Sequence, residues 1–321
     1  MIIRPLLAFL LFVAGIKLGD LAGRKRLLTK KRLRRNWLKL TGGFGPWSIG
    51  VLEGPDPFSL VDPGPSLNPV LTGADVTDVD ALFVADPFVI KRGTEFFMFF
   101  EIMKRKEERG CIGAAISQDG KDWTYLGVVL EEDFHLSFPC VFKRRDKIYM
   151  VPESSDDWSV RLYEAEGFPG GWRHVGNLLA GYQFKDPTIF RHKGLWWLFV
   201  SAGKNEITNL YFSERLLGKW TAHAQNPIVR LDKKRARSAG RILEYNGKIF
   251  RLAQDNSKRY GREVLAWEIT SLSPASYRER LAVPRPLVTA SGRGWNRAGM
   301  HTLNPVKVGK MWLGLVDGRR F

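Results

Sequence analysis

Cysteine is scarce in this sequence of 321 residues, which contains only Cys111 and Cys140. The two cysteines lie in separate apolar stretches and lack the Cys-x-x-Cys spacing of zinc sites and redox motifs. Small secreted domains that depend on disulfides are far richer in cysteine. We therefore expect two buried free thiols and neither a disulfide framework nor a zinc site.

Several short signatures of enzyme chemistry are also missing. The sequence has no Gly-x-Ser-x-Gly nucleophile elbow. Gly170-Gly171 and residues 292–294 are turns without the strand-glycine-helix context of a phosphate loop. Asp78-Val79-Asp80 is an Asp-x-Asp pattern, which is too short to mark a glycosyltransferase without a nucleotide-sugar fold around it. No cofactor is expected.

Helical patterns are missing after residue 40, where no long amphipathic period occurs. Short runs rich in aromatic and branched residues alternate there with turn signals such as Asp119-Gly120 and Asn246-Gly247. The hydrophobic content of 44% is ample for a core. The sequence therefore predicts an all-β protein.

The longest hydrophobic run is confined to residues 6–16 and is shorter than the roughly 20 residues of a membrane span. A basic run, residues 24–35, follows it in place of a small-residue cleavage site. Each cation near an anionic bilayer contributes about 1 kcal/mol of attraction. We therefore expect residues 1–41 to form an anchor or leader, with residues 1–36 on an anionic membrane surface.

The position of the positive charge along the chain bears on the partners and on the cellular location of the protein. Residues 1–40 hold about +10 of the formal net charge of +17, so the rest of the chain is only mildly basic and no nucleic-acid partner is expected. Basic flanks favour the cytoplasmic face of the membrane. An uncleaved leader with a solvated basic linker is the alternative, and it leaves a secretory or lumenal location open.

One unit recurs along the rest of the chain. In each copy an apolar run leads to a polar residue, and an aromatic-rich strand follows after a turn. The copies start about 50 to 60 residues apart, which is the period of propeller blades. The five copies begin at residues 83, 137, 185, 237 and 300.

The last copy ends after two strands, whereas residues 47–54 and 68–71 look like the back half of a unit. If these N-terminal strands complete the C-terminal blade, the ring closes and no sheet edge stays open. We therefore predict a five-bladed β-propeller over residues 46–318, preceded by a short apolar and basic segment. A β-sandwich or two small β-domains is the alternative.

A set of uncommon runs occurs in order within this region: Val84–Phe88, Phe134–Pro139, Met150–Glu153, Lys185–Thr188, Ala253–Asp255 with Tyr260-Gly261, and Trp295–Thr302. The set resembles the propeller domain of the glucosamine inositolphosphorylceramide transferase family. That domain is itself similar to the five-bladed propellers of glycoside hydrolase families forty-three, thirty-two and sixty-eight. In the plant transferase a separate glycosyltransferase module follows the propeller, so the resemblance implies a carbohydrate-handling propeller and not sugar transfer by this chain.

The first strand of each blade lines the channel of a propeller, so polar residues at the strand starts should meet at one mouth. These residues are Asp86, Ser137, Asp186, Arg237 and His301. Glycoside cleavage needs one carboxylate as base or nucleophile and one protonated carboxyl as acid.

The resemblance assigns roles to two carboxylates. It implies that Asp86 is the base or nucleophile and that Asp186 is the stabiliser that orients the sugar. Glu153 is the candidate general acid, and Glu101 in the equivalent place of the first copy is its substitute. The structural alternative is that Asp-Pro only opens turns and that Glu153 is a solvated loop charge.

Other residues are candidates for holding the substrate. Histidines offer contacts to sugar hydroxyls or a channel metal, but a lone histidine is more often structural, so no metal is expected. Trp295 is placed to stack on a sugar ring. Arg161, Arg237, Arg241 and Arg251 exceed what a neutral sugar needs and fit an anionic ligand, unless they pair with blade carboxylates. The candidate substrate-binding residues are His135, Arg161, Arg237, Gln254, Asp255, Tyr260, Trp295, Asn296 and His301.

Two functions agree with these features. The first is a membrane-associated enzyme that acts on a glycosidic bond of an anionic polysaccharide or glycolipid. The second is a non-catalytic propeller that binds a glycan or lipid headgroup and assists a separate glycosyltransferase. Carboxylates buried in arginine pairs, with no room for a sugar, would favour the second.

Overall fold

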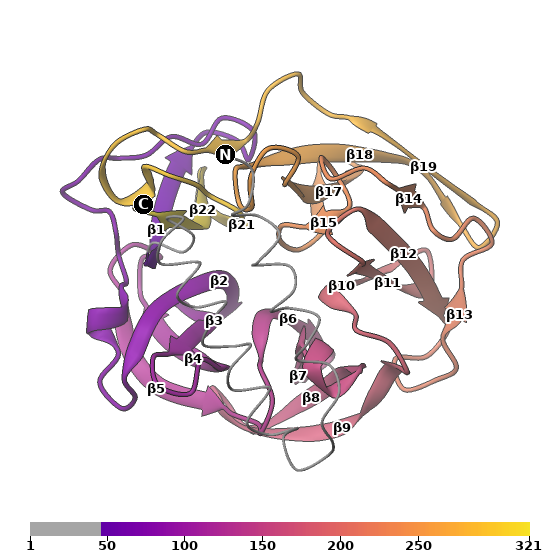
Figure 1. Ribbon diagram of the computed structural model, residues 1–321, viewed down its shortest axis with the longest axis horizontal. Helices are drawn as coiled ribbons and strands as arrows, with labels where there is room; N and C mark the ends of the chain where they lie inside the picture. The colour runs from indigo at the N-terminus through magenta and orange to yellow at the C-terminus, as the bar shows by residue number, and fades with distance from the viewer. Residues whose placement is uncertain (1–45) are drawn as a thin grey trace, which may run out of the picture. The chain divides into compact units, whose positions relative to one another are not determined.

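The computed structural model describes residues 46–321, and Pro46–Phe321 forms one compact unit. Five antiparallel sheets surround a central axis in this unit as the blades of a propeller (Figure 1). The expected anchor or leader, residues 1–41, lies outside the described residues. Between residues 46 and 321, no helix has both the length and the apolar character of a membrane span.

Blades I to IV are each built from strands that follow one another in the chain. Blade I contains β2 (Ala81–Arg92), β3 (Glu95–Lys104), β4 (Gly110–Ser117) and β5 (Thr124–Leu130). Blade II contains β6 (Ser137–Arg144), β7 (Lys147–Glu153), β8 (Ser159–Gly167) and β9 (Gly170–Ala180). Blade III contains β10 (Lys185–His192), β11 (Leu195–Ala202), β12 (Ile207–Ser213), β13 (Thr221–Ala222) and β14 (Val229–Arg230).

The remaining blades are less regular. Blade IV contains β15 (Arg237–Ser238), β16 (Leu243–Tyr245), β17 (Lys248–Asp255), β18 (Glu263–Ser273), β19 (Ser276–Leu281) and β20 (Val288–Thr289). Blade V contains β21 (Leu303–Val308), β22 (Met311–Arg319) and β1 (Trp47–Gly54). Three short 3-10 helices lie in the connections: η2 (Gly73–Asp75), η3 (Ser155–Asp157) and η4 (Gly294–Asn296).

The ring is closed by a strand from the opposite end of the chain. β1 pairs antiparallel with β22 along its whole length, from Trp47 opposite Arg319 to Gly54 opposite Trp312. β22 in turn pairs with β21, so the order across blade V is β1-β22-β21. The prediction of an all-β, five-bladed propeller closed by N-terminal residues is therefore confirmed.

Blade V has no regular fourth strand among the described residues. The backbone of the segment after β1 pairs with it through two isolated bridges, from Glu53 to Val61 and from Ile49 to Leu71. Five prolines lie between residues 55 and 69. A proline has no N–H to give to a ladder, so this segment cannot pair continuously.

Asn68 takes the place of a strand partner for β1. Its side chain accepts the Val51 N–H at 2.8 Å and donates to the Val51 carbonyl at 2.8 Å. In blade III, Asn226 bonds both backbone groups of Leu210 on β12 in the same way, at 2.8 and 2.7 Å. Residues 68–71 and 226–229 both read Asn-Pro followed by two apolar residues, and the two asparagines supply hydrogen bonds to a third strand in the same way.

We expect Asn68→Ala to lower the free energy of unfolding by about 2–4 kcal/mol. The change leaves the N–H and C=O of buried Val51 without partners, and each unpaired buried group costs about 1–3 kcal/mol. Urea denaturation followed by tryptophan fluorescence measures the loss. Thr94→Ala, in an exposed turn, should stay within about 0.5 kcal/mol of the wild type. Equal losses in the two variants would contradict the role given to Asn68.

Apolar side chains fill the spaces between neighbouring blades. The largest cluster joins blades I, II and III and contains the buried Phe88, Phe99, Phe138 and Met150. Other clusters join blade V to blade I, blade IV to blade V, and blade III to blade IV. Because every blade packs on both of its neighbours, the inner strands keep fixed positions around the axis.

Candidate functional site

Three inner strands share a bend. Asp86, Phe138 and Asp186 adopt left-handed backbone angles, with φ of 53°, 47° and 46°. Each is followed by proline, and each strand changes register against its partner at this point. Such a conformation costs a residue other than glycine about 1–3 kcal/mol and is found most often at functional sites. The bends re-aim the side chains of blades I, II and III at one end of the propeller.

The strand register shows which positions are equivalent. Ser137 lies opposite Glu153 just as Ala85 lies opposite Glu101. Ser137 therefore corresponds to Ala85, the residue before Asp86, and Phe138 occupies the position of Asp86 in blade II. The bend adds a residue to the inner strand, which a comparison of sequences alone does not reveal.

Carboxylates on the second strands hold two of these bends. Asp317 on β22 accepts the backbone N–H of Asp86 at 3.1 Å. Glu153 at the end of β7 accepts the backbone N–H of Asp186 at 3.0 Å. Each carboxylate thus supports the aspartate of the next blade around the ring. Sequence reasoning did not single out Asp317, although its place near the end of a second strand matches that of Glu153.

Asp186 is 1% exposed and lies in a two-pronged ion pair with Arg237. Nε of Arg237 donates to one carboxylate oxygen of Asp186, Nη2 donates to the other at 3.1 Å, and Gln254 donates to the carboxylate at 3.2 Å. The guanidinium carbon lies 5.2 Å from the centre of the Tyr260 ring, and Nη2 lies 3.8 Å from Glu153. The structure therefore brings five of the predicted site residues into one group.

Asp86 belongs to a second group on the blade V side of the mouth. Its Oδ1 accepts a hydrogen bond from Thr302 at 2.7 Å, and His301 Nε2 lies 3.6 Å from the same oxygen. His301 Nδ1 lies 2.7 Å from Asp317, although its N–H direction departs from that of a regular hydrogen bond. Trp47 stacks on the His301 ring with 4.2 Å between ring centres. Thr302 and Trp47 are site residues that sequence reasoning missed, because neither shares the recurrent Asp-Pro signal.

Glu101 and His135 complete the acidic mouth. Glu101 is 6% exposed on β3. The backbone N–H of Gly110 donates to His135 Nδ1 at 2.9 Å, so neutral His135 carries its proton on Nε2, which lies 3.5 Å from Glu101. Both oxygens of Glu153 accept hydrogen bonds at 3.0 Å. Beyond the His135 contact, no group within residues 46–321 donates to Glu101, so its carboxyl is free of the framework bonds that hold Glu153.

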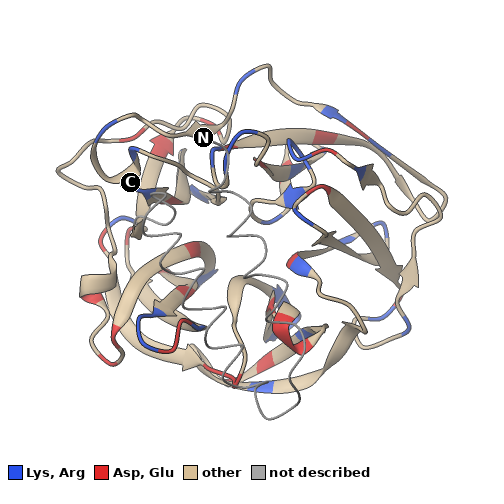
Figure 2. Cartoon of the chain, in the orientation of Figure 1, with Lys and Arg blue, Asp and Glu red and all other residues tan. Residues whose placement is uncertain are grey.

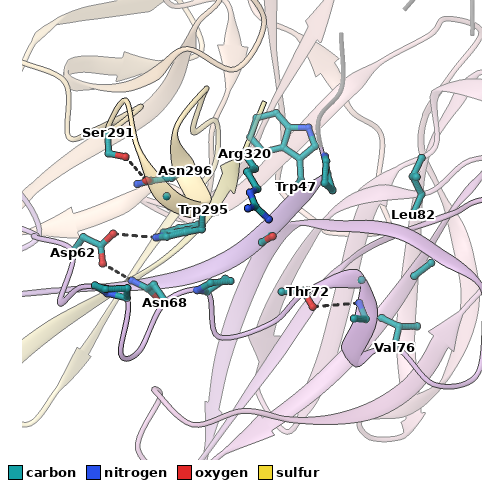
Figure 3. A pocket seen from close by; sticks show the side chains of 18 of the residues that line it. Trp47, Asp62, Asn68, Thr72, Val76, Leu82, Ser291, Trp295, Asn296 and Arg320 are labelled. Atoms are coloured by element: carbon teal, nitrogen blue, oxygen red, sulfur yellow. Dashed lines mark hydrogen bonds between the residues drawn. The ribbon is translucent and has the colours of Figure 1, made fainter. Parts of the chain in front are cut away.

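Trp295 lies in a cavity beside the mouth (Figure 3). The cavity has a volume of about 1180 Å³, and Trp47 forms part of its wall. The indole lies against Gly50 and Gly318, where any added side chain would meet its ring. Its Nε1 donates to Asp62 at 3.1 Å. The structure thus holds Trp295 as a fixed aromatic surface next to the carboxylates and not among them.

Three other predicted residues have local partners. Asn296 accepts a hydrogen bond from Ser291 of its own loop at 2.6 Å (Figure 3). Arg161 binds the carboxylate of Asp157 at 2.7 Å, and Asp255 binds a neighbouring arginine at 3.1 Å. The structure does not bring these side chains into the group around Asp186.

The arginines that favoured an anionic ligand are engaged within the propeller. Arg251 pairs with Glu279 at 2.7 Å, and Arg241 donates to Asn304 at 3.2 Å. Arg161 and Arg237 are held by the aspartates described above. Three of these four arginines thus form ion pairs with carboxylates of the propeller, as the alternative expects, so the arginines no longer argue for an anion at the mouth.

A cation has one potential position at the mouth. Asp86, His301 and Asp317 bring one ligand atom each within 4.8 Å of one another. Both carboxylates already accept hydrogen bonds, from the Thr302 hydroxyl or from backbone N–H groups. A metal ion would have to displace part of this network, and the expectation of no metal stays a prediction.

The sequence profile described as "Glucosamine inositolphosphorylceramide transferase 1, N-terminal" matches residues 41–319. The chain belongs to this family. Proteins named glucosamine inositolphosphorylceramide transferase 1 from Oryza sativa subsp. japonica and Arabidopsis thaliana are 36% identical over 308 residues and 37% identical over 302 residues. The matches cover 88% and 86% of this chain but 41% and 39% of those proteins. The chain therefore spans about two fifths of the length of these relatives.

Solved structures share the fold of this transferase-family domain. A family 117 glycoside hydrolase from Zobellia galactanivorans has a TM-score of 0.55 at 15% identity, covering 86% of this chain and 91% of that one. The catalytic domain of the GH62 alpha-L-arabinofuranosidase of Coprinopsis cinerea has a TM-score of 0.55 at 15% identity, covering 73% and 90%. Identities this low establish the propeller fold and no common activity.

The mouth of this transferase-family domain holds an excess of carboxyl groups over cations. Arg237 and His301 face five carboxyl groups: Asp86, Glu101, Glu153, Asp186 and Asp317. Burial raises the pKa of Asp86 to about 6, opposed by the His301 charge. Burial raises the pKa of Asp186 to about 7, opposed by Arg237. Burial and then the charge of Asp86 hold the pKa of Glu101 well above its usual range.

For Asp317 and His301, the effect of the charged partner on the pKa outweighs the effect of burial. Burial disfavours ionised Asp317, but the charge of His301 and hydrogen bonds from backbone N–H groups outweigh it and lower the pKa of Asp317. Burial likewise disfavours charged His301, but Asp317 outweighs it and raises the pKa of His301. The mouth therefore combines three carboxyl groups whose pKa is raised, Asp86, Asp186 and Glu101, with Asp317, whose pKa is lowered. This mixture is what acid and base catalysis by carboxyl groups requires.

We expect the protein to be more stable at pH 5 than at pH 8. The pKa values of Asp86 and Asp186 in the folded state are about 6 and about 7, above the ordinary value of 3.8, so the native state binds more protons than the unfolded state between about pH 4 and pH 7. Stability then falls as pH rises through this window, and His301 acts in the same direction because its pKa is also raised. Melting temperatures across this range measure the effect, and Asp86→Asn should reduce the slope. A melting temperature that rises with pH would contradict it.

Proposed function

We propose that this propeller is a carbohydrate-active domain that acts on a glycosidic bond at its acidic mouth. In this proposal Asp86 is the base or nucleophile, Glu101 is the general acid, and Asp186 positions the sugar. The observation that carries the proposal is that Asp86 and Glu101 are two buried carboxyl groups at one mouth, where the charge of Asp86 acts on Glu101. Glu153, the acid candidate from the sequence, supports the Asp186 backbone instead.

The chemistry is that of a two-carboxyl glycosidase. Glu101 gives its proton to the oxygen of the leaving group as the glycosidic C–O bond breaks. Asp86 either attacks the anomeric carbon or takes a proton from the attacking water. His135 faces Glu101 with its Nε2–H and orients the carboxyl. The spacing of the carboxyl groups in the bound state decides the stereochemistry, at about 5–5.5 Å for retention and about 6.5–9.5 Å for inversion.

The proposed substrate is a glycan or glycolipid that contains glucosamine. The relatives are named for glucosamine and inositolphosphorylceramide. A sugar amine would be attracted by the excess of carboxyl groups at the mouth. An anionic part of a glycolipid must then lie outside the mouth, and the cavity of Trp295 offers the exposed Arg293 and Arg320 for it. Trp295 would stack on an intervening sugar ring.

A binding screen followed by product analysis tests the enzymatic proposal. The wild type is screened against glucosamine-containing glycans and glycolipids, and each bound compound is examined for cleavage by mass spectrometry. We expect cleavage by the wild type and binding without cleavage by Asp86→Asn. If the wild type cleaves none of the compounds that it binds, the propeller is not a glycosidase.

The second candidate function is a non-catalytic propeller that assists a separate glycosyltransferase. One observation favours it: Asp186 and Glu153 are both tied to Arg237. The same screen decides between the candidates, because this function requires glycan binding that survives Asp86→Asn without product in either protein.

We also propose that the protein is membrane-associated through residues 1–36, with the propeller on the cytoplasmic face and a lumenal location as the alternative. The apolar and basic sequence of this segment supports the proposal. Protease protection in sealed membrane vesicles distinguishes the two faces. Recovery of the full chain in the soluble fraction at low salt would contradict membrane association.

A further inference from the structure

The end of the propeller opposite the mouth gathers positive charge. The inner strands run away from the mouth, so the turns that join them to the second strands lie at the far end. These turns span residues 91–95, 143–147, 191–195, 244–248 and 307–311, and they contain three carboxylates and eleven cations, coloured in Figure 2. We call the cations the basic ring: Lys91, Arg92, Lys143, Arg144, Arg145, Lys147, Arg191, Lys193, Lys248, Lys307 and Lys310.

The basic ring is exposed and mostly unneutralised. Ten of its members are exposed, and Arg144 is partly buried. Lys147 and Lys248 pair with glutamates of the outer strands. In the part of the chain that the structure describes, no other member pairs with a carboxylate. The positive field at this end is therefore available to a partner.

Two blades of the ring enclose a small cavity of about 330 Å³. Lys91 and Arg92 of blade I and Lys143 of blade II line it, together with the acidic residues Asp146 and Glu166. The Arg92 guanidinium lies 5.1 Å from the centre of the Phe168 ring, which holds it at the cavity. A phosphate-sized group fits such a cavity, and cations from two blades would meet it.

The turns on the mouth side differ in composition. The turns between second and third strands, residues 105–109, 154–158, 203–206 and 256–262, together contain seven cations and five carboxylates. Arg105 and Arg262 pair there with aspartates. The strong excess of cations thus belongs to the turns between first and second strands and is not a general property of the loops.

We propose that the basic ring docks the propeller onto an anionic lipid surface, with the acidic mouth facing away from the bilayer. Lysine-rich point charges spread over five turns suit many phosphate headgroups at once. Met311 is 43% exposed beside Lys310 and offers an apolar tip at headgroup depth. This docking requires neither glycosidase activity nor a particular sugar.

A nucleic acid fits this face less well than a membrane. The ring is made of turn tips, and no helix or ribbon stands out from them to enter a groove. The aromatic rings that adjoin it, Phe96, Phe168 and Trp196, each have a cation over their face and do not offer a stacking surface for bases.

Vesicle sedimentation with the full chain tests the proposal. The probes are phosphatidylcholine vesicles with and without phosphatidylserine. The ring variant carries Lys143→Gln, Arg145→Gln, Lys193→Gln and Lys307→Gln. The mouth-side variant removes the same charge from exposed positions through Lys106→Gln, Lys204→Gln, Lys258→Gln and Arg259→Gln. We expect the ring variant to bind the anionic vesicles at least about tenfold more weakly than the wild type, since each cation contributes up to about fivefold. The mouth-side variant should stay within about threefold of the wild type.

An orientation measurement separates the ring from residues 1–36, which are also expected to meet the membrane. A fluorophore is attached through Thr94→Cys in a ring turn or through Ser257→Cys on the mouth side, because Cys111 and Cys140 are buried. Brominated lipids should quench the label at position 94 and spare the label at position 257.

Equal losses in the two variants, or quenching at position 257, would overturn the proposal. Binding of inorganic phosphate or single-stranded RNA without binding of anionic vesicles would overturn it as well.

Discussion

The Glu101→Gln protein is expected to form product about 10²–10⁴ times more slowly than the wild type on any glycan that the wild type cleaves. Glutamine keeps the size of the side chain but has no acidic proton to give to the leaving group. Burial raises the pKa of Glu101 well above its usual range, which favours the protonated form that a general acid needs. Initial rates by chromatography of the released sugar measure the loss.

The matched control is Glu153→Gln, which changes the equivalent position of blade II. Glu153 holds the backbone of Asp186, so this variant should lose stability and keep more of its activity than Glu101→Gln. An aryl glycoside with a good leaving group needs little acid assistance and should restore the rate of Glu101→Gln but not that of Asp86→Asn. Loss of that rescue, together with a larger defect in Glu153→Gln, would return the acid role to Glu153.

Replacement of Arg237 by methionine is expected to destabilise the fold by about 3–5 kcal/mol at pH 8. The change leaves the buried carboxylate of Asp186 without its two-pronged partner and also removes the nearest cation from Glu153. The penalty should shrink at pH 5, because a protonated Asp186 needs no counter-charge. Urea denaturation at both pH values measures the difference.

A second substitution and a conservative one sharpen this test. Asp186→Asn added to Arg237→Met removes the stranded charge and should recover a large part of the loss. Arg237→Lys should recover little, because lysine lacks the planar fork that meets both oxygens and lies over Tyr260. If Arg237→Met lowers the free energy of unfolding by less than about 1 kcal/mol, the ion pair does not stabilise the fold.

The fold was accessible from the sequence because its units repeat. Five copies with similar spacing predicted five blades, and the short last copy predicted that residues near Trp47 would complete it. The pairing of β1 with β22 confirms the closure. The missing fourth strand of blade V was less obvious, because prolines prevent the ladder and the side chain of Asn68 replaces it.

The site was predictable only where a residue type and a backbone bend coincide. Asp86 and Asp186 precede proline and lie at equivalent bends, and both reach the mouth. Gln254 and Asp255 were both proposed, yet adjacent residues of a strand point to opposite faces, and Gln254 alone bonds Asp186.

The placement of other site residues depends on segments that are distant in the sequence. Trp295 is held beside the mouth because Gly50 and Gly318, from the two ends of the chain, leave room for its ring. Glu101 and Glu153 occupy equivalent positions in sequence. They differ because Glu153 meets a backbone N–H of the next blade, whereas Glu101 meets the side chain of His135. No local pattern encodes that difference.

The closure of blade V also fixes where the polypeptide enters and leaves the domain. Trp47 and Arg319 lie opposite each other on neighbouring strands, which are about 4.8 Å apart, and Trp47 touches His301 at the mouth. In a longer member of the family, a domain fused at either flank would be tethered at the rim of the acidic opening. Such a tether raises the effective concentration of the fused domain around any sugar held there without a new contact surface.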